Sequence, residues 1–372
     1  MAVPFIDIAR TVREISAEVE RDWAEVLGRC EFVGGPRVAT LERELCRVLQ
    51  VPQAVSCANG TDALVVALQA AGVVRGSRVA LPNLTFWATY EAVAQLGATP
   101  VLVDIDPDDC QMSFDDFVRA HDEHRFGAAI LVHLFGWASA RLDDFRRLCA
   151  ERGIELIEDG AQSFGVTHRG VPLTAGAATS TLSFYPAKVI GGAMDGGAIL
   201  FQSRERSDLA RSLCNHGRAE HYSYARVGWN SRMGGAQAAF LLRMLARLDI
   251  ILASRRAGAA YYRARLAEAG PRVRCFGPPP DVAENGYLAV MTLHGCDPVR
   301  VGERLAAAGI GSARTYPQTM DQQPPAADAL RTGDLRHSRA FCASVFNLPL
   351  FAGITEAECE ESVRALLGAL ES

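Results

Sequence analysis

The sequence of 372 residues contains no long apolar run: nowhere do roughly 18 apolar residues follow one another, the length that a helix needs to span a bilayer. Its first ten residues have neither a basic start nor an apolar stretch of the kind found in secretory signal peptides. We therefore expect a cytoplasmic protein with no membrane partner.

Excess positive charge is also missing, since 38 Lys and Arg face 43 Asp and Glu, a formal net charge of -5. Such a balance is not typical of electrostatic nucleic-acid binding, so no nucleic-acid partner is expected. The ten cysteines include no Cys-x-x-Cys pair and no zinc-ligand spacing. We predict no metal site and interpret the cysteines as reduced thiols of a cytoplasmic protein.

Two common nucleotide-binding signatures, the Gly-x-Gly-x-x-Gly fingerprint and the Walker A lysine loop, are absent, which removes the main support for NAD or ATP binding. What the chain does contain is alternation of short β-branched runs with amphipathic helical patterns. The predicted strands are Ala54–Cys57, Arg78–Leu81, Pro100–Ile105, Ala128–Leu134, Ile154–Glu158, Thr179–Phe184 and Gly197–Phe201, and the clearest helices are Thr61–Ala71 and Leu142–Arg152. This alternation predicts an α/β fold with a mostly parallel seven-stranded sheet between helices.

After Gly234 the pattern changes. The segment Ala236–Tyr262 predicts one long helix, or two helices with a break near Asp249, and a Pro-rich loop follows at Gly277–Pro280. A strand at Leu288–Leu293 and helices near Pro298–Ala308 and Glu356–Leu370 then form a smaller α+β unit. We predict a large domain at residues 1–250 and a small C-terminal domain at residues 251–372.

Lys188 is the most informative candidate site residue, because it closes Ser183–Lys188 and precedes a Gly-rich stretch. A single lysine is usually a solvated surface charge, but one in a tight turn can capture a carbonyl compound as a Schiff base. Asp159 ends a predicted apolar strand, where an ionised carboxylate can keep a pyridine nitrogen protonated. A lysine and an acid with these properties are what a protein contributes to pyridoxal phosphate chemistry.

Other candidates also follow predicted strands. Gly60 and Thr61 begin a predicted helix that can bind a phosphate, although a plain helix cap explains them equally well. Phe86 can stack on a flat ring, Gln162 can contact such a ring, and Ser183 can add a hydroxyl to a phosphate site. Because the carboxyl ends of parallel strands share one edge, their order along the chain predicts a single ligand site there.

These and other segments together resemble the DegT/DnrJ/EryC1/StrS family of sugar aminotransferases, a fold-type I group that uses pyridoxal 5′-phosphate. The segments that carry the resemblance are Asn59–Leu64, Thr85–Thr89, Gly97–Val101, Asp104–Pro107, His133–Gly136, Glu158–Gln162, Ser183–Lys188, Asp195–Ala198, Asn215–Gly217, Gly228–Met233 and Leu348–Phe351. They span nearly the whole chain.

The resemblance implies a role for each candidate. Lys188 would carry the cofactor covalently and move protons, and Asp159 would pair with its ring nitrogen. The remaining implied contacts are Phe86 stacked on the ring, Gln162 against it, and Gly60, Thr61 and Ser183 on the phosphate. Asn230 would complete the phosphate site of a neighbouring subunit, which implies a homodimer with two shared active sites.

The implied reaction transfers an amino group from an amino acid, with L-glutamate as the expected donor, to a C3 or C4 keto group of a nucleotide-linked deoxy sugar. Phe32 and Tyr316 are candidate substrate contacts. Two departures from the family pattern leave the substrate open: Phe135-Gly136-Trp137 stands where Tyr-Gly-Gln is common, and Gly234-Gly235 stands where an acidic pair is common.

Three alternatives remain at this point. One is an aminotransferase that acts on a cyclitol or another free carbocyclic ketone, and a second is a non-catalytic regulator that binds pyridoxal phosphate. The third is a related enzyme that dehydrates a sugar, but such relatives carry histidine where this chain has Lys188.

Overall fold

The computed structural model describes residues 3–371. The α-helices are α1 (Ile8–Arg29), α2 (Pro36–Leu49), α3 (Gly60–Ala70), α4 (Trp87–Gln95), α5 (Phe114–His124), α6 (Leu142–Arg152), α7 (Arg204–Cys214), α8 (Gly235–Leu245), α9 (Leu248–Leu266), α10 (Pro298–Ala307), α11 (Arg336–Ser344) and α12 (Glu356–Glu371). The strands are β1 (Gln53–Cys57), β2 (Arg78–Pro82), β3 (Thr99–Val103), β4 (Ala128–Val132), β5 (Glu155–Asp159), β6 (Thr167–His168), β7 (Val171–Pro172), β8 (Thr179–Ser183), β9 (Gly197–Phe201), β10 (Arg218–Glu220), β11 (Ser223–Tyr224), β12 (Val273–Cys275), β13 (Val282–Ala283), β14 (Ala289–Leu293), β15 (Leu330–Arg331) and β16 (Val345–Leu348). Short 3-10 helices are η1 (Leu134–Gly136), η2 (Leu173–Gly176), η3 (Ala267–Arg272), η4 (Met320–Gln322) and η5 (Pro324–Ala326).

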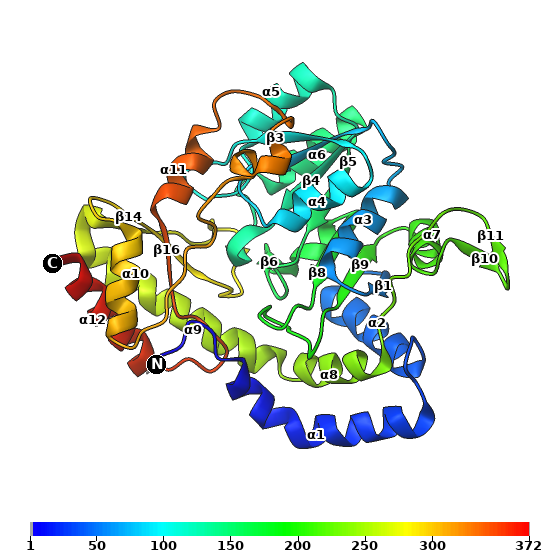
Figure 1. The fold of residues 1–372 in the computed structure, drawn as a ribbon, viewed down its shortest axis with the longest axis horizontal. Helices are drawn as coiled ribbons and strands as arrows, with labels where there is room; N and C mark the ends of the chain where they lie inside the picture. The colour runs from blue at the N-terminus through cyan, green and yellow to red at the C-terminus, as the bar shows by residue number, and fades with distance from the viewer. Residues whose placement is uncertain (1–2, 372) are drawn as a thin grey trace.

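The central sheet has the strand order β1-β9-β8-β5-β4-β2-β3-β15. Neighbouring strands are parallel from β8 to β15, and β9 runs antiparallel to both β1 and β8. The helices α3, α5, α6 and α7 pack on this sheet, and α1 and α8 run beside each other along one side of the molecule (Figure 1). The predicted α/β architecture with a mostly parallel sheet is confirmed.

Burial explains why the strands were recognisable. Every residue of β4 and of β9 is buried, as expected for strands with helices on both faces, so each reads as a continuous apolar run. All seven predicted strands overlap an observed strand of this sheet, and Gly197–Phe201 has the predicted bounds. The helix Leu142–Arg152 also has the predicted bounds.

In the part of the chain that the structure describes, the sheet has eight strands, one more than predicted. The extra strand, β15, comes from the C-terminal part of the chain and pairs in parallel with β3, with Leu330 opposite Val101 and Arg331 opposite Leu102. A strand of two residues is too short to show a periodic pattern in the sequence. It is held in place by backbone hydrogen bonds to the neighbouring strand.

A smaller sheet, β12-β14-β16, is antiparallel and packs with α9, α10 and α12 around its own apolar cluster. The predicted long helical segment is two helices, because the chain turns at Ala246 and Arg247 between α8 and α9. Val3 belongs to the cluster of the smaller unit, whereas β15 belongs to the large sheet. The division into residues 1–250 and 251–372 stays a prediction.

No helix within residues 3–371 is both long and apolar enough to cross a membrane. In the same part of the chain, no three His, Cys, Asp or Glu side chains are grouped so that they could hold a metal ion.

Candidate active site

A cavity of about 520 Å³ lies at the carboxyl ends of the parallel strands. Its lining includes eight of the ten residues predicted to contact cofactor or substrate: Gly60, Thr61, Phe86, Asp159, Gln162, Ser183, Lys188 and Tyr316. Asn230 and Phe32 lie outside it. The volume is in the range of small-molecule binding sites.

The start of α3 forms one end of the cavity. The Asn59 side chain accepts a hydrogen bond from the backbone N–H of Asp62 at 2.8 Å and so caps the helix. A Cβ atom on Gly60 would lie 2.8 Å from Cβ of Ser183, so only glycine allows β8 to approach this closely. The result is a helix N-terminus with free N–H groups beside two hydroxyls, Thr61 and Ser183, which is an arrangement suited to a phosphate.

Asp159 ends β5 at the base of the cavity and is 5% exposed. Burial raises the pKa of its carboxyl group above the usual value, although the N–H of Ala161 and the positive charge of Lys188 oppose this shift. The Ala161 N–H reaches one carboxyl oxygen at 3.0 Å. A buried acid with a raised pKa in a cavity is a candidate partner for a cationic ligand group.

The neighbouring carboxylate, Glu158, points to the other side of the sheet and is fully paired. Arg146 donates to both of its oxygens at 2.7 and 2.8 Å, and His133 Nε2 donates at 2.8 Å. Burial alone would raise the pKa of Glu158, but these hydrogen bonds and charges outweigh it and lower the pKa to about 2. Of the two adjacent acids, Asp159 is therefore the one available to a ligand.

Gln162 is fixed at both ends of its amide. Its oxygen accepts from the backbone N–H of Phe135 at 2.7 Å, and its NH₂ group donates to the hydroxyl of Tyr316 at 2.9 Å. The Phe86 ring is 55% exposed and lies 6.2 Å from the Tyr316 ring, measured between centroids. An exposed aromatic side chain in a cavity wall is available to stack on a planar ligand.

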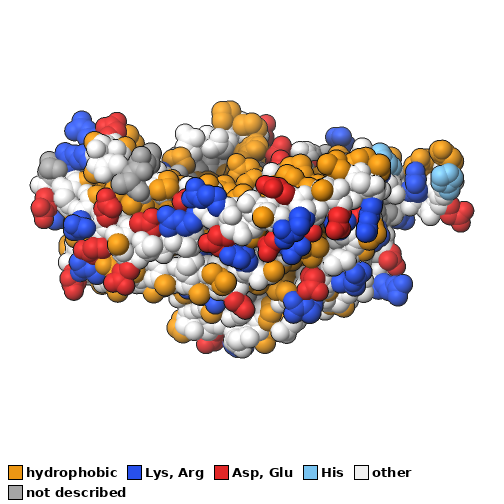
Figure 2. Space-filling view, turned by 90° about the horizontal axis from the view of Figure 1, so that it is seen from below, with side chains coloured by type: hydrophobic (Ala, Val, Ile, Leu, Met, Phe, Trp, Pro, Cys, Tyr) orange, Lys and Arg blue, Asp and Glu red, His pale blue; other side chains and the backbone are white. Residues whose placement is uncertain are grey.

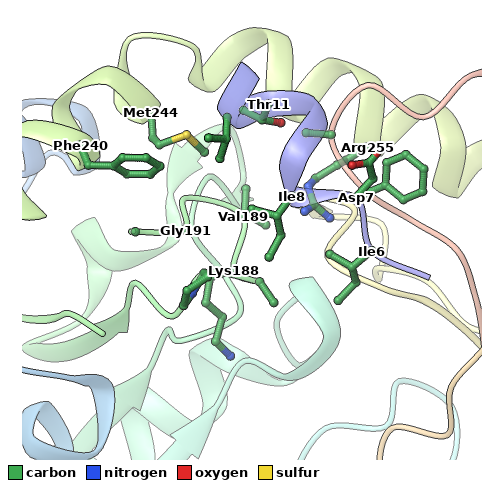
Figure 3. Close-up of a pocket in the computed structure, with 16 residues that line it drawn as sticks. Ile6, Asp7, Ile8, Thr11, Lys188, Val189, Gly191, Phe240, Met244 and Arg255 are labelled. Carbon is green, nitrogen blue, oxygen red and sulfur yellow. The ribbon is translucent and has the colours of Figure 1, made fainter. Parts of the chain in front are cut away.

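Lys188 lies in a tight turn in which its N–H donates to the carbonyl of Tyr185 at 2.8 Å. A Cβ on Gly191 would lie 2.1 Å from the carbonyl oxygen of Pro186, so the turn needs glycine there. Figure 3 shows the Lys188 side chain extending away from a small adjacent pocket of about 30 Å³, which Val189 and Met244 help to line. Its amine instead reaches the larger cavity, where it lies 3.5 Å from the hydroxyl oxygen of Tyr287.

Tyr287 is a site residue that sequence reasoning missed. It lines the cavity from the smaller unit and lies two residues before the start of β14. The signal available in the sequence is its position just ahead of the predicted strand Leu288–Leu293, which belongs to the predicted C-terminal domain.

Asn230 is exposed and pairs with Asn215 in an isolated β-bridge, where Arg232 donates to its side chain. Phe32 is 57% exposed and lies in the loop between α1 and α2. This loop contacts the start of α8: a Cβ on Gly235 would lie 2.3 Å from the carbonyl oxygen of Glu31. A side chain at Gly234 or Gly235 would therefore collide with the backbone of this loop.

The cavity residues fit pyridoxal phosphate. A lysine amine and a buried carboxyl face the same space, and a helix start with two hydroxyls provides a phosphate site. These are the groups that the chemistry of this cofactor requires.

Comparison with known proteins gives the same answer. The model of the DegT/DnrJ/EryC1/StrS aminotransferase family matches residues 13–367. The chain is 35% identical over 327 residues to UDP-2-acetamido-2-deoxy-3-oxo-D-glucuronate aminotransferase of Pseudomonas aeruginosa, which covers 88% of this chain and 89% of that protein. It is 33% identical over 350 residues to dTDP-3-amino-3,4,6-trideoxy-alpha-D-glucose transaminase of Streptomyces venezuelae, which covers 94% of this chain and 91% of that protein.

Among solved structures, DesV of S. venezuelae in complex with a ketimine intermediate superposes with a TM-score of 0.94. The match covers 100% of this chain and 99% of that chain at 31% sequence identity.

Proposed function

This chain belongs to the DegT/DnrJ/EryC1/StrS aminotransferase family, and we propose that it transfers an amino group from L-glutamate to a C3 or C4 keto group of a nucleotide-linked deoxy sugar. It is an aminotransferase that depends on pyridoxal phosphate. The observation that carries the proposal is the placement of the Lys188 amine and the Asp159 carboxyl in one cavity, next to the start of α3.

Bound pyridoxal phosphate supplies a protonated pyridine ring that accepts an electron pair from the substrate carbon. The side chains of this protein bind the cofactor and transfer the proton. Asp159 holds the proton on the ring nitrogen, and the α3 start with Ser183 binds the phosphate. Lys188 would take the proton from the donor α-carbon as general base and deliver it to the C4′ carbon of the cofactor as general acid.

Relatives support the substrate class, because the proteins with 35% and 33% identity are named for UDP-linked and dTDP-linked sugars. The cavity itself has a further requirement. Lys188 is its only Lys or Arg among the described residues, yet a sugar diphosphate and a dicarboxylate donor both need positive charge. We infer that cationic groups come from a second copy of the chain.

The segment around β10 and β11 is the candidate for this contribution. It projects from the body of the molecule as an arm (Figure 1), and Figure 2 shows apolar side chains on its tip. Tyr222 is 79% exposed and Val227 is 88% exposed. Within residues 3–371, Arg218 and Arg226 form no ion pair with a carboxylate, and Nε of Arg218 is buried without a partner.

The proposed assembly is a homodimer with two shared active sites, in which each arm brings Asn230 and its arginines to the cavity of the partner. Exposed apolar side chains on an arm are typical of a surface that is covered by another molecule. A closed two-fold arrangement would bury both arms in equivalent contacts. A cytoplasmic location belongs to the same proposal, because all ten cysteines are free thiols.

The test is incubation of the purified protein with ¹⁵N-labelled L-glutamate and a panel of nucleotide-linked 3-keto and 4-keto sugars, followed by mass spectrometry. We expect ¹⁵N in an amino sugar and formation of 2-oxoglutarate, with no transfer by a Lys188→Ala control that still binds cofactor. Transfer to a free cyclitol without a nucleotide would contradict the substrate class. Bound cofactor that reacts with no amine donor would contradict the catalytic function.

A further inference from the structure

The amine of Lys188 has a single hydrogen-bond acceptor among residues 3–371, the hydroxyl oxygen of Tyr287 at 3.5 Å. The amine also lies 5.2 Å from the centroid of the Tyr287 ring. The hydrogen bond is long, as such contacts often are before a substrate is bound. Among the described residues of the smaller unit, Tyr287 alone makes a hydrogen bond or ring contact with Lys188.

Tyr287 is held rigidly at this position. Its backbone N–H donates to the side-chain oxygen of Asn285 at 2.9 Å, and the Asn285 NH₂ group donates to the carbonyls of Gln162 and Phe164 at 2.8 and 3.0 Å. Asn285 is fully buried. These hydrogen bonds connect the start of β14 directly to the segment that follows Asp159, so the position of Tyr287 is fixed relative to the cavity.

Two further contacts restrict the same backbone. Arg255, which is 5% exposed, donates to the carbonyls of Gly286 and Tyr287 at 3.4 and 3.5 Å. Gly136 permits the close approach, since a Cβ there would lie 2.2 Å from the side-chain oxygen of Asn285 and 3.0 Å from Cβ of Tyr287. A tyrosine that served only as a cavity wall would not need this support from buried polar side chains.

We propose that Tyr287 is a positioning residue that orients the Lys188 amine for proton transfer. The inference depends on the proposed function. A neutral amine has two N–H bonds and one lone pair, and an N–H donated to the Tyr287 oxygen fixes the direction of the lone pair. The lone pair would then accept the proton from the donor α-carbon, which makes the amine an ammonium group. The ammonium group would deliver that proton to the C4′ carbon of the cofactor and become a neutral amine again. Tyr287 keeps its own proton throughout.

The first test is Tyr287→Phe, which removes the oxygen and keeps the ring, with Tyr261→Phe as the matched control. The Tyr261 hydroxyl bonds Glu360 between α9 and α12 and lies outside the cavity. In single-turnover reactions with L-glutamate, we expect the Tyr287→Phe rate to fall roughly 10- to 100-fold, the loss associated with a hydrogen bond to a charged group. The glutamate concentration that gives half-maximal rate should change less than about threefold, because binding is not affected.

Deuterium at the donor α-carbon allows the isotope effect on the single-turnover rate to be measured. This isotope effect would not change if Tyr287 had only a structural role. With proton transfer slowed selectively, the isotope effect of Tyr287→Phe should be larger than that of the parent enzyme and of Tyr261→Phe. A second readout needs no turnover: the cofactor-free protein is mixed with pyridoxal phosphate, and the rate of covalent capture by Lys188 is followed by absorbance. We expect slower capture in Tyr287→Phe alone, because the same orientation serves the attack of the amine on the aldehyde.

Tyr287→Leu, which removes both ring and oxygen, separates the two features of the side chain. A Tyr287→Phe enzyme with the parent rate, isotope effect and capture rate would overturn the inference, and a defect found only in Tyr287→Leu would assign the role to the ring. A change confined to the glutamate concentration dependence would make Tyr287 a substrate contact instead and would also overturn it. Failure of the proposed function is distinct, since the parent enzyme itself would then show no amino transfer.

Discussion

Glu158 and Asp159 are adjacent in sequence and differ in electrostatic state because the strand directs them to opposite faces of the sheet. Glu158 accepts hydrogen bonds from Arg146 and His133, whereas Asp159 is buried and, within residues 3–371, no arginine or histidine is hydrogen-bonded to it. Burial therefore disfavours the ionised form of Asp159 in the cofactor-free protein, and a bound cation would relieve this penalty. Titratable groups with such perturbed pKa values are common at ligand-binding and catalytic sites.

The free-energy penalty of burying the ionised carboxylate leads to a prediction for the stability of Asp159→Asn. Because burial raises the pKa of Asp159 in the folded state, its ionised form destabilises the cofactor-free protein. The variant should match the parent below about pH 4, where the carboxyl group is protonated in both the folded and the unfolded state, and should become the more stable protein as the pH rises to neutrality. Urea unfolding of both cofactor-free proteins across this pH range measures the difference.

The loaded Asp159→Asn enzyme should show the opposite effect on function. Loss of the ionic partner for the ring nitrogen should slow amino transfer roughly 10- to 100-fold. Equal free energies of unfolding of the two cofactor-free proteins at neutral pH would show that the buried carboxylate does not destabilise the fold.

Gly60→Ala tests the phosphate end of the cavity. The new Cβ would lie 2.8 Å from Cβ and 3.4 Å from the backbone Cα of Ser183, so α3 and β8 would have to separate. We expect the dissociation constant for pyridoxal phosphate to rise at least roughly tenfold, equivalent to about 1.4 kcal/mol, in a titration of cofactor-free protein. Gly127→Ala is the control, because no atom lies within 4 Å of a Cβ at that position; similar affinity in both variants would contradict the prediction.

The residues that follow strands were within reach of sequence reasoning, because the carboxyl ends of parallel strands share one edge. Gly60, Asp159 and Ser183 line one cavity for this reason. For Tyr287 the only sequence signal is its position ahead of a predicted strand, because it is placed in the cavity by its contact with Asn285 and not by a strand end of the large sheet. Nothing in the local sequence indicates that the two units meet there.

At the scale of secondary-structure elements, the buried negative charge of Glu158 on β5 is paired with a positive charge from α6. Arg146 on α6 crosses to Glu158 on β5, and His133 follows β4. Because Glu158 has a lowered pKa, the stability that this network contributes is present above the unfolded pKa and is lost as the pH falls towards 2.

Arg146→Ala should therefore lower the free energy of unfolding by about 3 kcal/mol at neutral pH, since it leaves a buried carboxylate without its main partner. Arg147→Ala provides the matched control on the same helix, because that side chain is 62% exposed and pairs only with surface acids. A loss of less than about 0.5 kcal/mol is expected for the control. Denaturant unfolding at pH 7 compares the two, and equal losses would rule out a special role for the buried network.

Secondary-structure elements with a continuous apolar pattern could be predicted from sequence, and those set by tertiary contacts could not. The bounds of β9 and α6 follow from apolar and amphipathic runs. The sequence predicts either one helix or two with a break near Asp249. The break lies at Ala246 and Arg247, and neither of these residues breaks a helix by itself. β15 was missed because its two residues are ordered only by pairing with β3.

At the scale of the whole molecule, the proposal of shared active sites predicts complementation between inactive variants. Lys188→Ala lacks its own amine, and Asn230→Ala lacks the group offered to the partner. After the two are mixed, unfolded and refolded together, half of the dimers should be mixed and contain one intact site, so activity should return to about one quarter of the parent value. The assay is amino transfer before and after mixing, with each variant refolded alone as the control; no recovery, or full activity of Asn230→Ala alone, would contradict shared sites.

The N-terminal segment connects the smaller unit to the cavity: Val3 pairs with Ile310, its N–H donates to the carbonyl of Gly309 at 3.2 Å, and Phe5 and Ile6 are part of the cavity lining. For protein production this has a practical meaning. An affinity tag fused ahead of this segment would lie within a few residues of the cavity lining. The tag would compete with the contacts that hold the N-terminal segment in place. A tag placed after α12, whose described residues do not line the cavity, leaves those contacts intact and is the safer choice for kinetic work.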